Sequence, residues 1–336
     1  MKRLSLPASL IAAAYLACAA AGAGAQALTL RVASYVPPNS TWDIGLKKLA
    51  ADFDRISGGR VKLVFPQSLR ASSDSDIIQK MKFGVDGALI TTMGVAELYP
   101  DSLALAIPSI IRSDEEYDAV LAVVEPLIRK KLADRYVVLA LAKGGWIRYF
   151  SKAPIVYPED LVKARMAVSA DDDKIQRLLQ SVGTRTVKAD MAALILQLSS
   201  NTVDAFYLSP VQLASLWTQY KSQVSYMSPF KVSPFLGAVI FTKQSWDKVP
   251  AEFRPRLEEA TREAARVMAR ESAKLEEDAI AAMVREGLKV PAYPADAEPK
   301  WNALYAEKRD SLVATMFSAD FLEAMRKALA SARSKR

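Results

Sequence analysis

The chain alternates between short stretches with the two-residue period of β-strands and longer stretches with the 3.6-residue period of helices. The clearest example runs from residue 28 to residue 92. A β-α-β-α-β order of this kind predicts parallel strands joined by right-handed helical crossovers. Strands are expected at residues 28–34, 61–65 and 86–92, and helices at residues 42–56 and 73–83.

The same alternation continues and predicts a second α/β lobe. Residues 144–150 are expected to be extended and to carry the chain into that lobe, and later strands are expected to lead back to the first lobe. Ser40 or Thr41 is suited to cap the helix at 42–56. Ser113 is suited to cap the long helix at 113–134. Further strands are expected at 104–108, 137–142, 165–169, 184–187, 203–208, 223–227 and 237–242, and helices at 113–134, 171–182, 191–198 and 210–220.

One predicted helix is long enough to brace both lobes. After Pro255, which suits a first helical turn, residues 256–286 contain no Pro and no Gly. Such a helix is on the order of 48 Å long. A surface coiled coil is the alternative, and the break of the apolar stripe at Glu271 argues against it. Two shorter helices are expected at 299–316 and 321–331.

The first 25 residues have the features of a secretory signal peptide. Lys2 and Arg3 precede an apolar run, and residues 23–25 provide the small-x-small pattern of a cleavage site. A membrane anchor is the alternative, but the run is short for a bilayer span. Cys18 lacks a well-placed upstream Leu for lipid attachment. We therefore expect export to the periplasm and removal of residues 1–25.

The chain contains no His, and its single Cys lies in the expected signal peptide. Serine-histidine triads, Cys-His pairs and zinc sites built on His or Cys are therefore excluded. No phosphate-binding or nucleophile-elbow motif is present. Three acids at residues 171–173 invite a metal interpretation, but they also suit the start of a helix. We expect a protein that is not an enzyme and that carries no cofactor and no metal.

The formal net charge of +8 does not point to nucleic acid. The basic residues are interspersed with acids, and no basic block is interleaved with aromatic residues. The simplest interpretation of this net charge is a mildly basic surface. Such a surface also favours encounters with anionic solutes. We expect a monomer that does not bind nucleic acid.

Several segments resemble the substrate-binding subunit of TRAP transporters, the DctP-like family. They include LRVASYVPPNSTWDIGLKKLAADFDRISGGRVKLVFPQSL, IIQKMKFGVDGALIT, LALAIPSII, GGWIRYFSKAPIVYPEDLVKARMAV and LILQLSSNTVDAFYLSP. Their order and spacing cover nearly the whole chain after residue 25. The resemblance implies a receptor that captures a small organic solute by cleft closure and delivers it to TRAP membrane permease subunits. A ligand-binding module of a membrane sensor is the alternative, and a hydrolase or lyase that uses carboxylates is a third possibility.

The implied fold class is α/β and periplasmic binding protein-like, with two α/β lobes around a ligand cleft and a long bracing helix. Lobe I is expected at residues 26–143 plus about 236–250, and lobe II at residues 144–235. The bracing helix is expected at 251–286, and helices that pack on the lobes at 287–336.

The chain departs from this family at its main carboxylate-binding position. The family commonly carries DLKGLKIRV, whose Arg binds a substrate carboxylate through its planar fork. Here the segment is DLVKARMAV, and Ala167 stands at that position. Arg165 lies two residues earlier, on the same face of a strand and about 6.6 Å away. It is a candidate replacement, although it matches a family Lys that we expect to be solvated.

Arg148 and Leu208 stand at two further positions where the family has a polar residue. Arg148 matches the family's second Arg, and it either contacts the solute or forms a structural ion pair between the lobes. Leu208 stands where the family has a polar Asn. Asn201 replaces a usual Gly, and Asn tolerates the left-handed conformation that a turn there requires.

The loss of two polar positions, with aromatic residues close by, predicts a pocket more apolar than a dicarboxylate site. The solute is either a carboxylate held by Arg148 or an apolar or aromatic compound. Each aromatic side chain near the site is also a candidate for the core. The expected ligand-binding residues are Tyr35, Thr92, Trp146, Arg148, Phe150, Ala167, Tyr207 and Ser209.

Overall fold

The computed structural model describes residues 27–34, 36, 40–71, 73–169, 173–189 and 191–334, without the side chains of residues 41, 191, 192 and 307–315. The expected signal peptide lies outside these residues. In the described part of the chain, no helix combines the length and the apolar character needed to cross a membrane.

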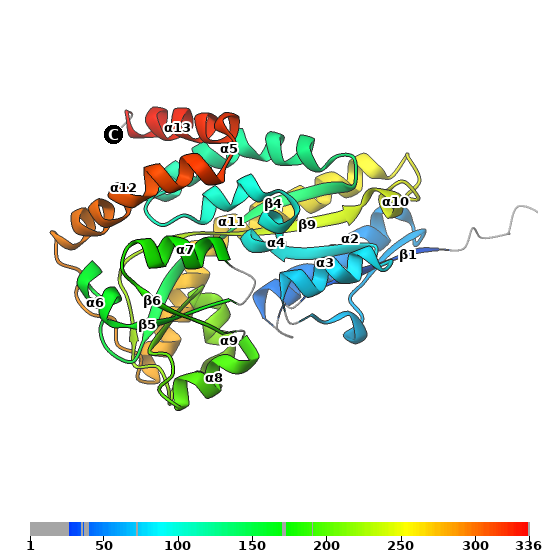
Figure 1. The fold of residues 1–336 in the computed structure, drawn as a ribbon. Helices are drawn as coiled ribbons and strands as arrows, with labels where there is room; N and C mark the ends of the chain where they lie inside the picture. The colour runs from blue at the N-terminus through cyan, green and yellow to red at the C-terminus, as the bar shows by residue number, and fades with distance from the viewer. Residues whose placement is uncertain are drawn as a thin grey trace, which may run out of the picture.

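One continuous sheet runs through both lobes (Figure 1). The strand order is β2-β1-β3-β9-β4-β7-β5-β6, and β8 pairs with β4. β1 is parallel to β2 and β3, and β5 is parallel to β6 and β7, as the alternation predicts. The strands are β1 (Leu28–Ala33), β2 (Val61–Val64), β3 (Gly87–Thr91), β4 (Tyr136–Ser151), β5 (Arg165–Val168), β6 (Arg185–Lys188), β7 (Ala205–Leu208), β8 (Tyr226–Met227) and β9 (Ser233–Thr242).

β4 and β9 connect the two lobes. The first part of β4 pairs with β9 in lobe I, and residues 148–151 pair with β7 in lobe II. The stretches expected separately at 137–142 and 144–150 therefore form one strand, with register shifts near residues 138–140 and 143–146. Because the sheet passes between the lobes without a break, the exact lobe boundaries stay a prediction.

Helices cover the sheet, and their ends follow the predicted capping chemistry. Ser40 accepts a hydrogen bond from the Asp43 N–H, and Gly58 ends the same helix in the left-handed conformation. Ser113 accepts from the Glu116 N–H. The helices are α2 (Thr41–Ser57), α3 (Asp74–Lys82), α4 (Thr92–Leu98), α5 (Asp114–Leu132), α6 (Pro158–Lys163), α7 (Asp173–Ser181), α8 (Met191–Ser199), α9 (Pro210–Tyr220), α10 (Lys243–Trp246), α11 (Arg254–Arg285), α12 (Ala297–Met316) and α13 (Ala319–Arg333), with short 3-10 helices η1 (Gln67–Leu69) and η2 (Pro100–Ala106).

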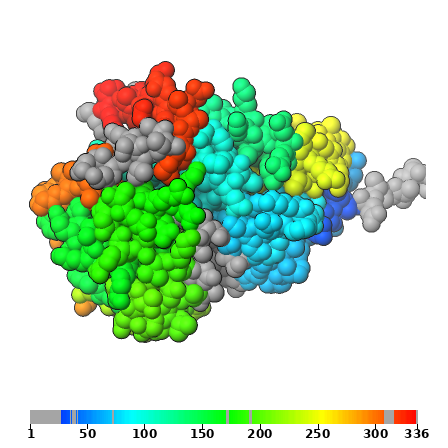
Figure 2. All heavy atoms as spheres, in the orientation of Figure 1, coloured from blue at the N-terminus to red at the C-terminus, as the bar shows by residue number. Residues whose placement is uncertain are grey.

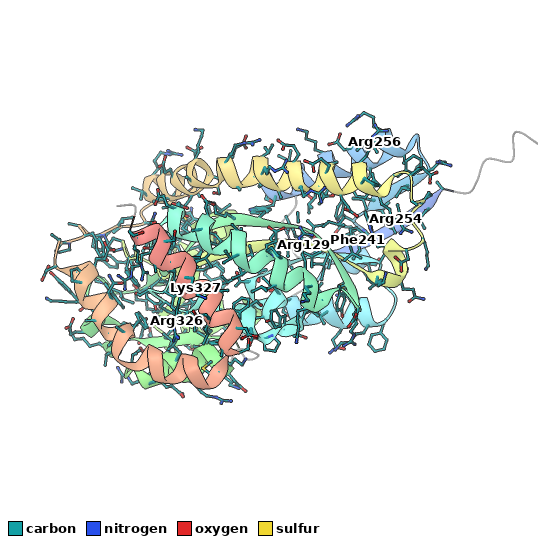
Figure 3. All side chains as sticks on the ribbon, turned by 90° about the horizontal axis from the view of Figure 1, so that it is seen from above. Arg129, Phe241, Arg254, Arg256, Arg326 and Lys327 are labelled. Carbon is teal, nitrogen blue, oxygen red and sulfur yellow. The ribbon has the colours of Figure 1, made fainter. Side chains whose placement is uncertain are left out.

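α11 is the predicted bracing helix. Its 32 residues run along one side of the whole molecule (Figure 3). It packs against α2 in lobe I, α9 in lobe II and the connecting strand β4. This helix therefore spans both lobes, and the predicted fold class is confirmed.

The strand expected at 104–108 is wrong, because most of this segment belongs to η2. Residues 102–105 are all buried, so an apolar run there has no periodicity to separate a buried strand from a buried helical turn. Pro100 starts this turn, and Ser109 after it has a left-handed φ of 60°. The strand expected at 223–227 shortens to β8, and α4, α6 and α10 were not predicted.

The C-terminal helices complete the core. Trp301 on α12 is fully buried and stacks on Phe230 at 4.5 Å between ring centroids. Tyr305 on the same helix shares a hydrogen bond of 2.8 Å with the hydroxyl of Tyr149 on β4. α13 packs against α5 in lobe I. These two helices thus contribute core residues to both lobes.

α13 is also fastened to lobe I by a buried carboxylate. Arg333 donates to both oxygens of Glu116 at 3.0 and 3.1 Å, and the Arg112 N–H donates at 2.9 Å. Burial alone would raise the pKa of Glu116, but these hydrogen bonds outweigh it and hold the pKa below its ordinary value. The stabilisation is therefore present above the unfolded pKa of about 4.3 and is lost as pH falls through the folded pKa.

We expect Arg333→Ala to lower the free energy of unfolding by about 1–2 kcal/mol at pH 7, less than for a fully buried pair, because the Arg333 side chain is 41% exposed. The difference from wild type should shrink as pH falls below about 4. Urea unfolding between pH 3 and 7 measures this. Lys327→Ala on the exposed face of α13 (Figure 3) is the control and should change little. A pH-independent loss would contradict the assignment.

Candidate functional site

The carboxyl ends of the parallel strands place the candidate site between the lobes. β1 and β3 end at Ala33 and Thr91 in lobe I, and β5 and β7 end at Val168 and Leu208 in lobe II. In open α/β sheets, ligands bind beyond these ends. Figure 2 shows the green surface of lobe II facing the blue and cyan surface of lobe I. We refer to this region as the cleft.

The lobe I wall of the cleft is held by Asp74. The Thr91 N–H donates to Asp74 Oδ1 at 2.9 Å, and the Thr91 hydroxyl donates to its other oxygen. A Cβ at Gly94 would lie 2.8 Å from Asp74 Oδ1, so only Gly fits there. Thr92, an expected ligand-binding residue, is 5% exposed, and its hydroxyl accepts from the Leu236 N–H at 3.0 Å. Thr92 thus ties the start of α4 to β9 at the edge of the cleft.

Two aromatic residues that were not predicted lie where the strands cross between the lobes. A Cβ at Gly144 on β4 would meet Phe235 at 2.4 Å and Trp42 at 3.3 Å, and one at Gly237 on β9 would meet Trp42 at 3.5 Å. Both rings therefore pack on bare backbone, and both are partly exposed. Two glycines on crossing strands are the sequence feature that could have indicated this contact.

Arg148 forms the buried ion pair that the sequence left as one of two possibilities. Its Nη2 and Nε donate to Glu276 Oε1 on α11 at 3.1 and 3.4 Å, and its Nη1 donates to the Pro229 carbonyl. The Trp146 N–H donates to Glu276 Oε2 at 2.8 Å. The Arg148 and Glu276 side chains are 10% and 8% exposed. This pair fastens the bracing helix to the connecting strand.

The bulge of β4 makes room for Glu276. Gly145 has a φ of +94°, and a Cβ there would lie 2.5 Å from Glu276 Oε2. A side chain at this position would be strained and would also displace the carboxylate. The backbone of the connecting strand is therefore shaped around the Glu276 carboxylate.

Arg165 has a carboxylate partner of its own. Its Nε and Nη2 donate to the two oxygens of Asp204 at 2.7 and 2.6 Å. The Arg165 guanidinium holds the pKa of Asp204 below its usual range, although partial burial opposes this shift. This bidentate pair uses the Nε and Nη2 donors of a guanidinium that lies at the amino end of β5, opposite the end that borders the cleft.

The lobe II wall is apolar where the family has polar residues. Ala167 is 5% exposed and packs in one core cluster with Phe150. Phe150 is fully buried and stacks on Phe206 at 5.6 Å. Tyr207 and Leu208 are partly exposed at the end of β7. Tyr207 and Leu208 are thus the partly exposed side chains at the carboxyl end of β7, beside a buried apolar core.

The other expected ligand-binding residues lie in different surroundings. Trp146 is 3% exposed, and the Lys231 ammonium lies 4.9 Å from its ring centroid. Ser209 is 1% exposed at the start of α9. Tyr35 lies outside the described residues. Solute contact stays a prediction for all eight residues.

A cavity of about 300 Å³ lies beside Arg148 on the α12 side. Phe230, Lys231, Tyr293 and Asn302 contribute to its walls. Ser109 and Arg112 of lobe I also line it, and Tyr293 lies between α11 and α12. None of its lining residues lies at the carboxyl end of a parallel strand. We therefore place the solute site in the cleft.

Of the three acids at residues 171–173, for which a metal site was considered, only Asp173 lies among the described residues. Asp173 pairs with Lys188 at 2.8 Å, and its two neighbours lie outside the described residues. The described residues contain no cluster of three potential metal ligands.

Two α/β lobes that meet at the carboxyl ends of their strands and share a bracing helix define a periplasmic binding protein-like architecture. The chain belongs to the DctP family, bacterial extracellular solute-binding protein family 7, whose model matches residues 32–316. This confirms the family resemblance seen in the sequence. No curated protein matches the chain.

Solved structures with the same fold come from several bacteria. A sugar acid binding protein from Advenella mimigardefordensis, in complex with galactonate, has a TM-score of 0.81 at 15% identity, over 91% of this chain and 99% of that chain. A TRAP periplasmic solute binding protein from Ralstonia eutropha with bound (S)-2-acetolactate gives 0.79 at 18%, over 92% and 99%. A Bordetella pertussis extracytoplasmic solute receptor that binds pyroglutamic acid gives 0.77 at 16%, over 91% and 99%.

Proposed function

We propose that this protein is the periplasmic solute receptor of a TRAP-type transporter. It captures a small organic solute in the cleft and delivers it to membrane permease subunits. The observation that carries the proposal is the family match over residues 32–316. Structural neighbours that hold galactonate, acetolactate or pyroglutamic acid support the size and class of solute.

The proposed mechanism is closure of the lobes around the solute. A solute that contacts both walls favours the closed arrangement by its differential affinity. β4 and β9 are suited to act as the hinge, because β4 has register shifts between the lobes and carries Gly144 and Gly145 there. α11 limits the motion, since it contacts both lobes. The protein works as an exported monomer that performs no catalysis and requires no cofactor.

A thermal-shift screen of residues 26–336 tests the receptor proposal. At a ligand concentration about 100 times Kd, stability rises by roughly 2.7 kcal/mol. For a chain of this size, that corresponds to a rise in Tm of roughly 4 °C. The screen should include galactonate, acetolactate, pyroglutamate, succinate and neutral aromatic compounds. Failure of every organic solute to stabilise the protein would contradict the proposal.

A cleft variant separates specific binding from surface effects. Leu208→Trp places a bulky ring on the partly exposed lobe II wall and should abolish the rise in Tm. Val123→Trp is the matched control, because Val123 is 39% exposed on α5, away from the strand ends. Equal ligand responses in the two variants would move the site away from the cleft.

A further inference from the structure

We propose that the cavity beside Arg148 is a second binding site, and that it takes a phosphate group, either as free phosphate or on a small phosphate ester. Its volume of about 300 Å³ lies at the lower end of the range for small-molecule sites. None of its lining residues lies at the carboxyl end of a parallel strand, so the cavity is separate from the cleft. The site is additional to the solute site of the proposed receptor and does not depend on it.

The walls of the cavity come from segments that are far apart in the sequence. Arg112 lies between η2 and α5 in lobe I, Arg148 lies on β4, and Lys231 lies in the connection between β8 and β9. Tyr293 precedes α12, and Asn302 lies on α12. The fold thus brings three cations from three separate segments to one cavity.

The charges that line the cavity differ in sign according to their exposure. Lys231 and Glu298 are exposed, and they carry opposite charges. Arg112 is partly buried and Arg148 is buried, and both carry a guanidinium group. Water and salt screen an exposed charge more than a buried one, so the two guanidinium groups dominate the potential inside the cavity. The cavity therefore favours an anion.

Arg148 keeps part of its hydrogen-bonding capacity for a ligand. A guanidinium carries five N–H donors. The Nε N–H and one Nη2 N–H bind Glu276, and one Nη1 N–H binds the Pro229 carbonyl. The second N–H of Nη1 and that of Nη2 have no acceptor among the described residues. Arg148 can therefore hold Glu276 and an anion in the cavity at the same time.

The acids nearest the other two cations offset them only in part. Glu116 accepts from the backbone N–H of Arg112, but the guanidinium that binds its two oxygens is that of Arg333. Asp114 Oδ2 lies 3.9 Å from Lys231 Nζ, and its Oδ1 lies 3.8 Å from a second Lys ammonium group. Arg112 and Lys231 therefore still add positive potential to the cavity.

A phosphate group fits this arrangement better than a carboxylate. It carries a charge of about −1.5 to −2 at pH 7 and three acceptor oxygens, so it can bind two guanidinium groups at once. A carboxylate has two oxygens, and one guanidinium fork is enough to bind both. Arg112 and Arg148 are the phosphate-binding pair, and Lys231 is an exposed third cation.

The α12 side of the cavity suits the rest of a phosphate ester. The Asn302 amide both donates and accepts hydrogen bonds. Partial burial, together with the charge of Glu298, raises the pKa of Tyr293 to about 12. The Tyr293 hydroxyl therefore keeps its proton at neutral pH and can donate it in a hydrogen bond. Hydroxyl groups of a small ester are suited to these partners.

Isothermal titration calorimetry of residues 26–336, in buffer free of phosphate and sulfate, tests the site with inorganic phosphate and with glycerol 3-phosphate. We expect both to bind, and the ester to bind more tightly because its hydroxyls reach Asn302. Arg112→Gln should weaken both about tenfold, about 1.4 kcal/mol. Lys231→Gln should weaken them only about threefold, because this side chain is exposed. Arg256→Gln, exposed at the end of α11 remote from α12 (Figure 3), is the matched control and should change nothing.

The outcomes separate this site from the receptor proposal. Leu208→Trp should bind both phosphates as the wild-type protein does, and a loss there would place them in the cleft and overturn the inference. Affinity that Arg112→Gln leaves unchanged would also overturn it. Arg112→Lys keeps the charge and should recover part of the affinity, which distinguishes lost binding from lost folding. Lactate that competes as well as phosphate would overturn the choice of ligand. A negative thermal-shift screen with organic solutes would contradict the receptor proposal alone.

Discussion

Glu276→Ala is expected to lower the free energy of unfolding by about 3–5 kcal/mol, because it leaves Arg148 buried without a counter-charge. The substitution also removes the acceptor of the buried Trp146 N–H. Urea unfolding at pH 7, followed by circular dichroism, measures the loss. Glu277→Ala at the exposed neighbouring position is the control and should stay within about 0.5 kcal/mol of wild type.

Two further results would show how the buried charges of Arg148 and Glu276 depend on each other. Glu276→Gln should cost less than Glu276→Ala, because the amide still accepts hydrogen bonds. The double variant Arg148→Met with Glu276→Leu should lose less than the sum of the two single variants, since neither charge is then left unpaired. A loss below about 1 kcal/mol for Glu276→Ala would show that the pair does not fasten α11 to β4.

Gly145→Ala is expected to cost more than the same substitution at any glycine where only the backbone conformation is at issue. The left-handed φ alone costs about 1–3 kcal/mol. The new Cβ would in addition lie 2.5 Å from Glu276 Oε2 and push the carboxylate away from Arg148. We expect a total loss of about 3–5 kcal/mol in urea unfolding, close to that of Glu276→Ala.

Gly183→Ala is the matched control for this prediction. Gly183 has a similar φ of +86°, but a Cβ there would meet only ordinary contacts with Val162, the closest at 3.7 Å. The excess loss at Gly145 therefore reports the contact with Glu276. It should vanish when Gly145→Ala is made in a Glu276→Ala background. Equal losses at the two glycines in the wild-type background would contradict the account.

Much of the fold could be predicted because local patterns and tertiary structure agree. The two periods identify most strands and helices, Ser40 and Ser113 cap the helices as expected, and the stretch without Gly or Pro becomes α11. Asn201 does adopt the left-handed conformation, with a φ of 57°. The strand predicted at residues 104–108 was wrong, because burial on all sides removes the periodicity that distinguishes a strand from a helical turn.

The site could be predicted only in outline. The sequence correctly offered a structural ion pair for Arg148 but did not name Glu276, which lies more than 100 residues away. The available indication for Glu276 was its position among residues that share one face of the helix. Ser272, Glu276 and Met283 are all buried on α11. The two strand glycines indicate that a side chain packs on bare backbone there, but they do not identify Trp42, because that contact depends on how α2 packs against the connecting strands.

Small-angle X-ray scattering of residues 26–336 tests the central claim most directly. The measurement compares the free protein with the protein saturated by the solute that gives the largest rise in Tm, and repeats the comparison with Leu208→Trp. We expect the radius of gyration of the wild-type protein to decrease on binding, because the lobes close around the solute, and the variant not to respond. An unchanged radius of gyration in the saturated wild-type protein would contradict a receptor that works by closure of its cleft.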